Sequence, residues 1–123
     1  LKVDENLIAH GYYVEDSAKY HLPSLIAHGA TAIICGNDLL AVGAIKECEH
    51  LEIKVPQELS IIGFDNLPIA EEISPALTTI GQDRINLGRC SYSTLFLLID
   101  KVSASKSLLR PQLIVRDTTC KII

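Results

Sequence analysis

The stretch "TAIICGNDLLAVGAIKECEHLEIKVPQELSIIGFD" (residues 31–65) decides the fold of this chain. It opens with a short β-branched run at 31–36, continues into a segment of helical periodicity at 37–50, and closes with a second apolar strand at 59–65. Apolar strands joined through a helix are typical of parallel sheets, because a parallel pair needs a long crossover that covers its face. The stretch therefore predicts a parallel α/β unit.

The segment 37–50 also indicates how its helix packs. Gly43 in a helix interior costs about 1 kcal/mol relative to alanine, which predicts a close neighbour at that position. Asn37 or Asp38 can cap the first turn. Three apolar residues fall on one face at helical spacing and are expected to be buried: Ala41, Ile45 and Cys48.

The rest of the chain repeats this alternation. The expected elements are strands at 7–13, 76–82 and 111–119 and helices at 15–29 and 83–101. Gly29 marks the end of the first helix, Pro23 is expected to kink that helix or split it in two, and Asp83 can cap the last helix. The pattern predicts a doubly wound α/β fold, with a mostly parallel sheet and helices on both faces.

Composition limits the classes of function. The chain has 123 residues, of which 48% are hydrophobic and 21% charged, so it is expected to form one globular domain. It holds no apolar run of about 18 residues that could span a membrane. The formal net charge is −4 and no Lys/Arg cluster occurs, so direct DNA contact by this chain is not expected.

The cysteines predict a reducing environment. They lack metal-ligand spacing and lie in apolar surroundings, so they are expected to be buried thiols in a cytoplasmic protein. No metal or cofactor is expected. The four positions are Cys35, Cys48, Cys90 and Cys120.

Polar or aromatic residues follow the expected strands. In doubly wound sheets, ligands bind in the crevice beyond the carboxyl ends of the strands. The residues that reach this edge are Tyr13, Asn37, Asp65 and Gln82.

Each of the four has two interpretations. Asp65 can accept hydrogen bonds from vicinal hydroxyls or ring N–H groups, or it can cap the following turn. Asn37 can bind a sugar hydroxyl or cap the helix. Tyr13 can stack on a sugar or a base, or pack in the core, and Gln82 is suggested only by its position.

The sequence lacks the usual signals of an enzyme. No dinucleotide, Walker-type, G-x-S-x-G or H-E-x-x-H motif occurs, and the adjacent Glu71 and Glu72 would point about 100° apart on a helix. A phosphoacceptor receiver domain also places an aspartate after an apolar strand, but it needs a second acidic cluster for Mg²⁺. Only Asp38 is available for that cluster, and its position suits helix capping.

Three linked motifs resemble the effector-binding core of the lactose/galactose-repressor family of bacterial transcription regulators. They are "ND-LA-GA" after the first apolar strand, "VP-LS-IGFD", and "SP-LTTI-Q", all within residues 31–83. The closing "LIVRDTT" (113–119) is similar to the family's terminal strand, and "HGYYVEDSA" (10–18) is a less specific match. Where the family often has a second aspartate after "GFD", this chain has Asn66.

The resemblance implies a periplasmic-binding-protein-like fold of two lobes around a small effector. On that basis about 1–81 and 111–119 belong to the second lobe, and the helix at 83–101 belongs to the first lobe. The DNA-binding domain and most of the first lobe are then expected outside the matched segment. By position, Tyr13 lines the effector pocket and Gln82 lies where a strand crosses toward the other lobe. The resemblance also assigns Asn37 and Asp65 to binding hydroxyls or ring nitrogens of the effector.

The predicted function is therefore effector sensing, of a sugar or nucleoside, in a dimeric cytoplasmic regulator that contacts DNA through another domain. An exported sugar-binding protein and a small α/β enzyme are the alternatives. Dimer contacts are expected through 39–50 and 67–75, with Ala41 and Ile73 as positions to test. The apolar helix at 83–101 is expected to pack on this lobe or on a second chain.

Overall fold

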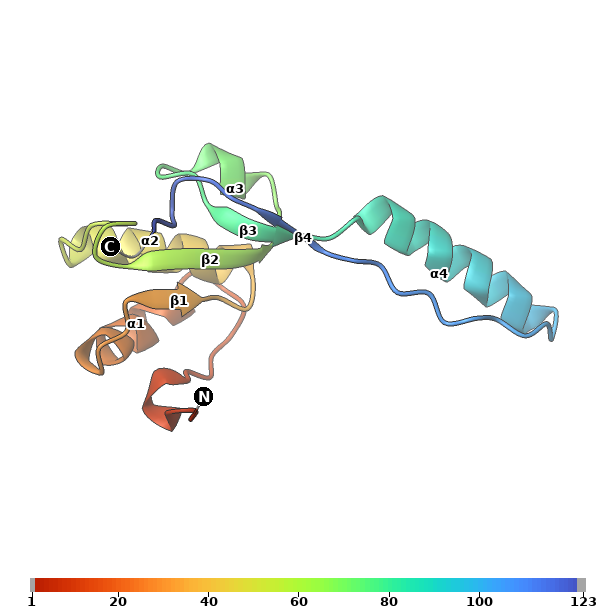
Figure 1. Ribbon diagram of the computed structural model, residues 1–123, viewed down its shortest axis with the longest axis horizontal. Coiled ribbons are helices and arrows are strands. Elements are labelled where there is room, and N and C mark those ends of the chain that lie inside the picture. The colour runs from red at the N-terminus through yellow and green to blue at the C-terminus, as the bar shows by residue number, and fades with distance from the viewer. Residues whose placement is uncertain (1, 122–123) are drawn as a thin grey trace.

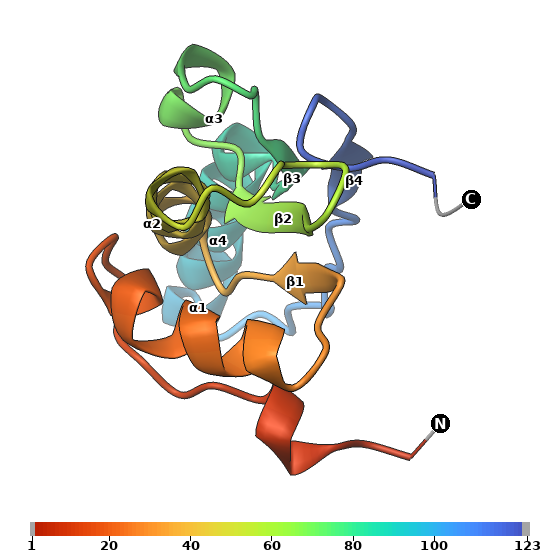
Figure 2. The same cartoon turned by 90° about the vertical axis from the view of Figure 1, so that its left-hand side faces the viewer.

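The computed structural model describes residues 2–121, and Figures 1 and 2 show its arrangement. A lobe of sheet and helices carries one long helix that projects away from it (Figure 1). The elements in chain order are η1 (Glu5–Leu7), α1 (Ser17–Ala27), β1 (Ala32–Ile34), α2 (Asp38–His50), β2 (Ser60–Asp65), α3 (Ile69–Glu72), β3 (Thr78–Gly81), α4 (Arg84–Ile99) and β4 (Gln112–Ile114).

The sheet has the strand order β1-β2-β3-β4. β1 pairs parallel with β2, and β2 pairs parallel with β3, whereas β4 runs antiparallel to β3. Parallel strands need a crossover connection. Here α2 joins β1 to β2, and α3 joins β2 to β3. The prediction of a mostly parallel α/β sheet is confirmed.

The core of the lobe lies between α2 and the sheet. The α2 face predicted from helical spacing is buried as expected, with Ala41, Ile45 and Cys48 all inside. Gly43 lies against the backbone of Glu15, so a Cβ there would meet the Glu15 carbonyl oxygen. The close neighbour that this glycine predicted is thus the segment that leads into α1.

The described helices of the lobe gather on one side of the sheet, as Figure 2 shows for α1, α2 and α3. Strand residues therefore alternate between two environments: Ile61 is fully buried under α2, whereas the side chain of Ile34 on β1 is 79% exposed. Helices were predicted on both faces; in residues 2–121 they lie on one.

The strand predicted at the amino-terminal end is wrong. Residues 7–13 do not form a strand; η1 occupies the start of this segment, and the chain then runs without regular structure. A strand needs a neighbour for its backbone groups, yet here the Tyr12 N–H bonds to Ser17 Oγ at 3.0 Å instead. Pro23 was expected to kink the following helix or to split it in two, and the split is excluded because α1 runs through this residue.

The helix α4 does not pack on the lobe. None of its residues is buried, and in Figure 1 it extends outward with segment 102–111 returning beside it. Its start is as predicted, since Asp83 accepts a hydrogen bond from the Asn86 N–H at 3.0 Å. The helix was expected to pack on this lobe or on a second chain, and the prediction that it packs on this lobe is therefore wrong.

The two positions chosen for testing the dimer are unsuitable. Ala41 is fully buried in the core, and Ile73 is partly buried against it. A charge at either position would disturb folding before it disturbed a surface contact. The exposed face of α2 instead carries Lys46 and Glu49.

Candidate functional site

The carboxyl ends of the parallel strands meet at one edge of the sheet. Ile34 of β1 pairs with Ile62 of β2. Asn37 comes three residues after Ile34, and Asp65 comes three residues after Ile62, so the two side chains lie at the same level of the sheet. Gln82 directly follows β3, whose last residues pair with the end of β2. The fold thus brings three of the predicted residues to the same edge.

Asn37 and Tyr13 form the first contact at this edge. Asn37 is the N-cap of α2: its Oδ1 accepts a hydrogen bond from the Leu40 N–H at 2.9 Å. Its Nδ2 donates to the backbone oxygen of Tyr13 at 3.2 Å. The ring of Tyr13 lies against Gly36 and is 66% exposed, so it is not a core residue. Asn37 therefore caps the helix and, with the same amide, attaches the Tyr13 segment to the edge.

Asp65 and Gln82 form the second contact. Gln82 Nε2 donates to Asp65 Oδ1 at 3.2 Å. Asp65 does not cap the next helix, because α3 has no side-chain cap, and the Leu67 N–H that follows bonds elsewhere. Of the two interpretations of this aspartate, turn capping is therefore wrong.

Asp38 has a role that the sequence did not reveal. Asn37 and Asp38 were both expected as possible caps of α2; Asn37 is the cap, whereas Asp38 is fully buried. It accepts hydrogen bonds from the Leu67 N–H at 2.7 Å and from Thr79 Oγ1 at 2.5 Å. Gly63 makes room for it, since a Cβ at that position would meet Asp38 Oδ1. In the sequence, the glycine inside the apolar run "SIIGFD" was the feature that could have indicated a close neighbour such as Asp38.

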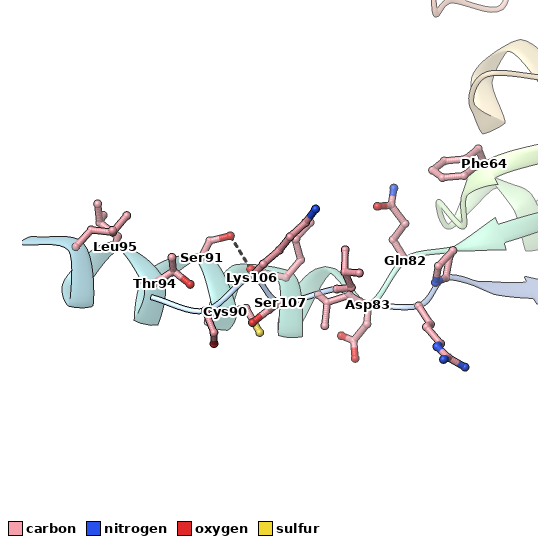
Figure 3. A pocket seen from close by; sticks show the side chains of 16 residues that line it. Phe64, Gln82, Asp83, Cys90, Ser91, Thr94, Leu95, Lys106 and Ser107 are labelled. Atoms are coloured by element: carbon pink, nitrogen blue, oxygen red, sulfur yellow. Dashed lines mark hydrogen bonds between the residues drawn. The ribbon is translucent and has the colours of Figure 1, made fainter. Parts of the chain in front are cut away.

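Two open grooves flank the candidate site. One, of about 520 Å³, lies between α4 and segment 105–111; it reaches the lobe at Phe64 and Gln82, as Figure 3 shows. The other, of about 550 Å³, lies between α1 and β1 and reaches Gly36. Tyr13, Asn37 and Asp65 line neither groove, so the edge that carries them is a surface in this chain.

The cysteines differ from the prediction. Cys35 and Cys48 are buried, Cys90 is half-buried and Cys120 is exposed. Burial raises the pKa of the Cys35 thiol to about 12 and that of Cys48 to about 11. Cys90 escapes the core because α4 stands clear of the lobe, and the Cys120 thiol donates a hydrogen bond to the Pro56 backbone oxygen at the surface.

The described residues offer no metal site. Within 2–121, no three side chains of His, Cys, Asp or Glu come together as ligands. Two of the histidines bond locally: His28 Nδ1 contacts the Ser24 oxygen at 2.7 Å and His50 Nδ1 contacts the Lys46 oxygen at 2.9 Å.

Over the same range, the structure contains no helix with the length and apolarity of a membrane span.

The chain is similar to known transcriptional regulators. The HTH-type transcriptional repressor PurR of Klebsiella pneumoniae (strain 342) is 35% identical over 120 residues, which cover 94% of this chain and 35% of the repressor. The crystal structure of the transcription regulator CcpA of Lactococcus lactis has a TM-score of 0.90 and 29% identity, over 97% of this chain and 45% of that one.

A third similar protein was crystallised with a ligand. It is a LacI family transcriptional regulator from Enterococcus faecium with bound ribose, with a TM-score of 0.82 and 28% identity; the match covers 92% of this chain and 43% of that one. The chain spans about a third of the length of the PurR repressors it matches. The profile of the periplasmic binding protein-like domain matches residues 3–119. The chain therefore belongs to the periplasmic binding protein-like domain family, with LacI-family transcriptional regulators among its relatives.

Proposed function

We propose that this chain senses a small effector for a DNA-binding transcriptional regulator. Its half of the effector site would be the edge of the sheet at the carboxyl ends of β1, β2 and β3, which carries Asn37, Asp65 and Gln82 and is called the strand-end edge below. The observation that carries the proposal is the convergence of Asn37, Asp65 and Gln82 at the carboxyl ends of three adjacent parallel strands. Ligands of open α/β sheets bind at such an edge. The similarity to repressors favours a regulator over an exported sugar-binding protein and over an enzyme.

The chemistry of the edge suits a ligand with hydroxyl groups or ring N–H groups. Only Oδ1 of Asp65 is engaged by a side chain within the described residues, so Oδ2 is available as an acceptor. Asn37 retains a second amide hydrogen after it donates to Tyr13. The exposed Tyr13 ring supplies an apolar face of the kind that stacks on a sugar or a base.

A pentose or a nucleoside is the favoured class of effector. Charge-assisted bonds from vicinal hydroxyls to a carboxylate contribute about 1.5–3 kcal/mol each. The similar regulator from Enterococcus faecium was solved with bound ribose, which makes D-ribose the first compound to test on this chain.

In the proposed architecture, residues 1–81 and 111–119 form the second lobe of a two-lobe domain, and α4 docks on the first lobe. Support comes from α4 itself: it leaves the lobe directly after Gln82, and all its large apolar side chains are exposed. An apolar helix with no buried residue needs a covering partner. The groove beside Gln82 would then lie between the lobes.

A dimer is proposed through 39–50 and 67–75, with the exposed side chains of α2 and α3 in contact. Effector binding would close the lobes, shift the relative position of the two copies, and change the DNA affinity of a separate domain. Its proposed location is the cytoplasm, as for a regulator that acts on DNA.

Isothermal titration of the 123-residue chain tests the proposal. The compounds are D-ribose, D-glucose, adenosine and adenine, one for each class of effector. We expect one of them to bind with a Kd of about millimolar strength, since only one side of the cleft is present. Asp65→Ala should abolish that binding, whereas the control Asp100→Ala, at the far end of α4, should not change it. Equal binding by both variants would refute the site.

A further inference from the structure

The turn after β2 has an unusual backbone. Asp65 and Asn66 both have positive φ, at 109° and 53°, although neither is glycine. Residues with side chains adopt this region at a cost and remain there only when their surroundings fix them. The turn carries the Asp65 carboxylate, so whatever fixes the turn also fixes the carboxylate.

One side of the turn is held by Asp38. Its Oδ2 accepts the Leu67 N–H at 2.7 Å, and its Oδ1 accepts from Thr79 Oγ1 at 2.5 Å. The carboxylate is fully buried, at the first residue of α2. It therefore joins the helix, the turn and β3 in a place where water cannot substitute for a lost partner.

The other side of the turn is held by Arg116. Its side chain is 13% exposed, and Nη2 donates to Asn66 Oδ1 at 2.9 Å and to Glu71 Oε1 at 2.7 Å. Nη1 donates to the Leu77 carbonyl at 2.8 Å. A planar fork with several fixed donors orients its partners in a way that a single ammonium cannot.

We propose that Asp38 and Arg116 are positioning residues for the effector site: they hold the Asp65–Leu67 turn so that the Asp65 carboxylate lies beside Gln82. The inference rests on the proposed function and deepens it. Arg116 bonds to Asn66 and Asp38 bonds to Leu67, the two positions that directly follow Asp65, and neither residue bonds to Asp65 itself. Their action on a ligand would therefore pass through the backbone of the turn.

Amide exchange measured by NMR tests the holding contacts without any ligand. Thr79→Val keeps the side-chain volume but removes a donor to Asp38, and Arg116→Lys removes the fork. We expect the Leu67 amide to exchange at least about tenfold faster in Thr79→Val, and the three-bond couplings of residues 65 and 66 to change in Arg116→Lys. The control Arg89→Lys, on exposed α4, should change neither quantity. Unchanged exchange and couplings in both variants would overturn the proposal.

A double-mutant cycle with D-ribose tests whether the contacts act through Asp65. Asn tolerates positive φ, so Asp65→Asn removes the charge without new strain. We expect Thr79→Val to raise the Kd about tenfold in the parent chain and less than about twofold in the Asp65→Asn background. Asp38→Asn, which keeps one acceptor, should bind ribose better than Asp38→Ala. Equal losses in both backgrounds would mean general destabilisation and would overturn the proposal.

The two proposals fail separately. If the parent chain does not bind ribose but exchange at Leu67 still responds to Thr79→Val, the proposed pentose site is wrong and the holding of the turn stands. If ribose binds and the cycle is additive, the effector site stands and the positioning role is wrong.

Discussion

At the scale of single residues, Gly43 and Gly63 show how closely segments of the lobe pack. Gly63 interrupts an otherwise apolar strand because the Asp38 carboxylate lies against its backbone. Gly43 interrupts α2 because the Glu15 backbone crosses there. Each glycine marks a place where a second segment comes closer than a side chain allows.

Gly63→Ala should destabilise the lobe. The new Cβ would meet Asp38 Oδ1 and lie 2.9 Å from Leu77 Cδ2, and overpacking of this kind costs about 1–3 kcal/mol. Urea unfolding followed by circular dichroism measures the loss. The matched control is Gly88→Ala on α4, which has nothing within 4 Å of its Cβ and should not lower stability. A midpoint unchanged by Gly63→Ala would contradict the packing described for Asp38.

The thiols should fall into two classes of reactivity. Thiolate is the reactive form, and burial raises the pKa of Cys35 to about 12 and of Cys48 to about 11. At pH 8, Ellman's reagent should therefore label Cys120 and Cys90 in the folded chain and all four thiols in urea. Rapid labelling of Cys35 in the folded chain would show that the core is open.

The same two pKa values predict how stability depends on alkaline pH. Unfolded thiols lose their protons near the ordinary value of 9.0, whereas the folded ones keep them to about 12 and 11. Above pH 9 the folded state therefore binds more protons than the unfolded state, and the free energy of unfolding falls as the pH rises.

At the scale of elements, the strands and helices of the lobe can be predicted from the local sequence, except where contacts with another segment determine the local structure. β1, α2, β2, β3 and α4 were predicted within a few residues because apolar runs and caps specify them locally. The short helix α3 was not predicted, and β4 ends at Ile114, five residues before the predicted end at 119. The strand predicted at 7–13 does not form: β1 remains the edge of the sheet in the described residues, and this segment instead bonds to the side chains of Ser17 and Asn37. Pro23 lies inside α1, where packing of Leu22 and Ala18 in the core outweighs its local cost.

Asn37 joins two elements, and its two roles can be separated by substitution. Asn37→Ala removes the cap of α2 and should lower stability by about 1 kcal/mol. Asn37→Asp keeps the cap and adds a favourable charge at the helix N-terminus, but it removes the donor to the Tyr13 oxygen. We expect Asn37→Asp to keep the urea midpoint of the parent while amide exchange in residues 12–14 becomes faster. Equal destabilisation by both changes would contradict a capping role.

At the scale of the whole molecule, the chain consists of a packed lobe and a projecting helix with little buried surface between them. The apolar content of α4 predicted burial, yet the described structure supplies no surface for it. Sequence reasoning found the lobe and the residues at its strand ends. It could not find Asp38 or Arg116, because their partners are distant in sequence: Thr79, Leu67, Asn66 and Leu77.

The independence of α4 is testable. Phe96→Glu changes an exposed residue of α4 and should leave the urea midpoint of the lobe unchanged, because no core contact is lost. Leu22→Ala, at a residue fully enclosed in the core, should cost about 2–5 kcal/mol. Destabilisation of the lobe by Phe96→Glu would show that α4 folds back onto it.

The most direct test of the account is an NMR titration of the isotope-labelled chain with D-ribose, because it reports where a weak ligand binds. We predict that the largest amide shifts occur together at Asn37, Asp65 and Gln82, with a common Kd, and that this Kd rises in Asp65→Asn. Shifts confined to the groove between α1 and β1, or no shifts at any residue with ribose at high millimolar concentration, would contradict the assignment of the strand-end edge as an effector site.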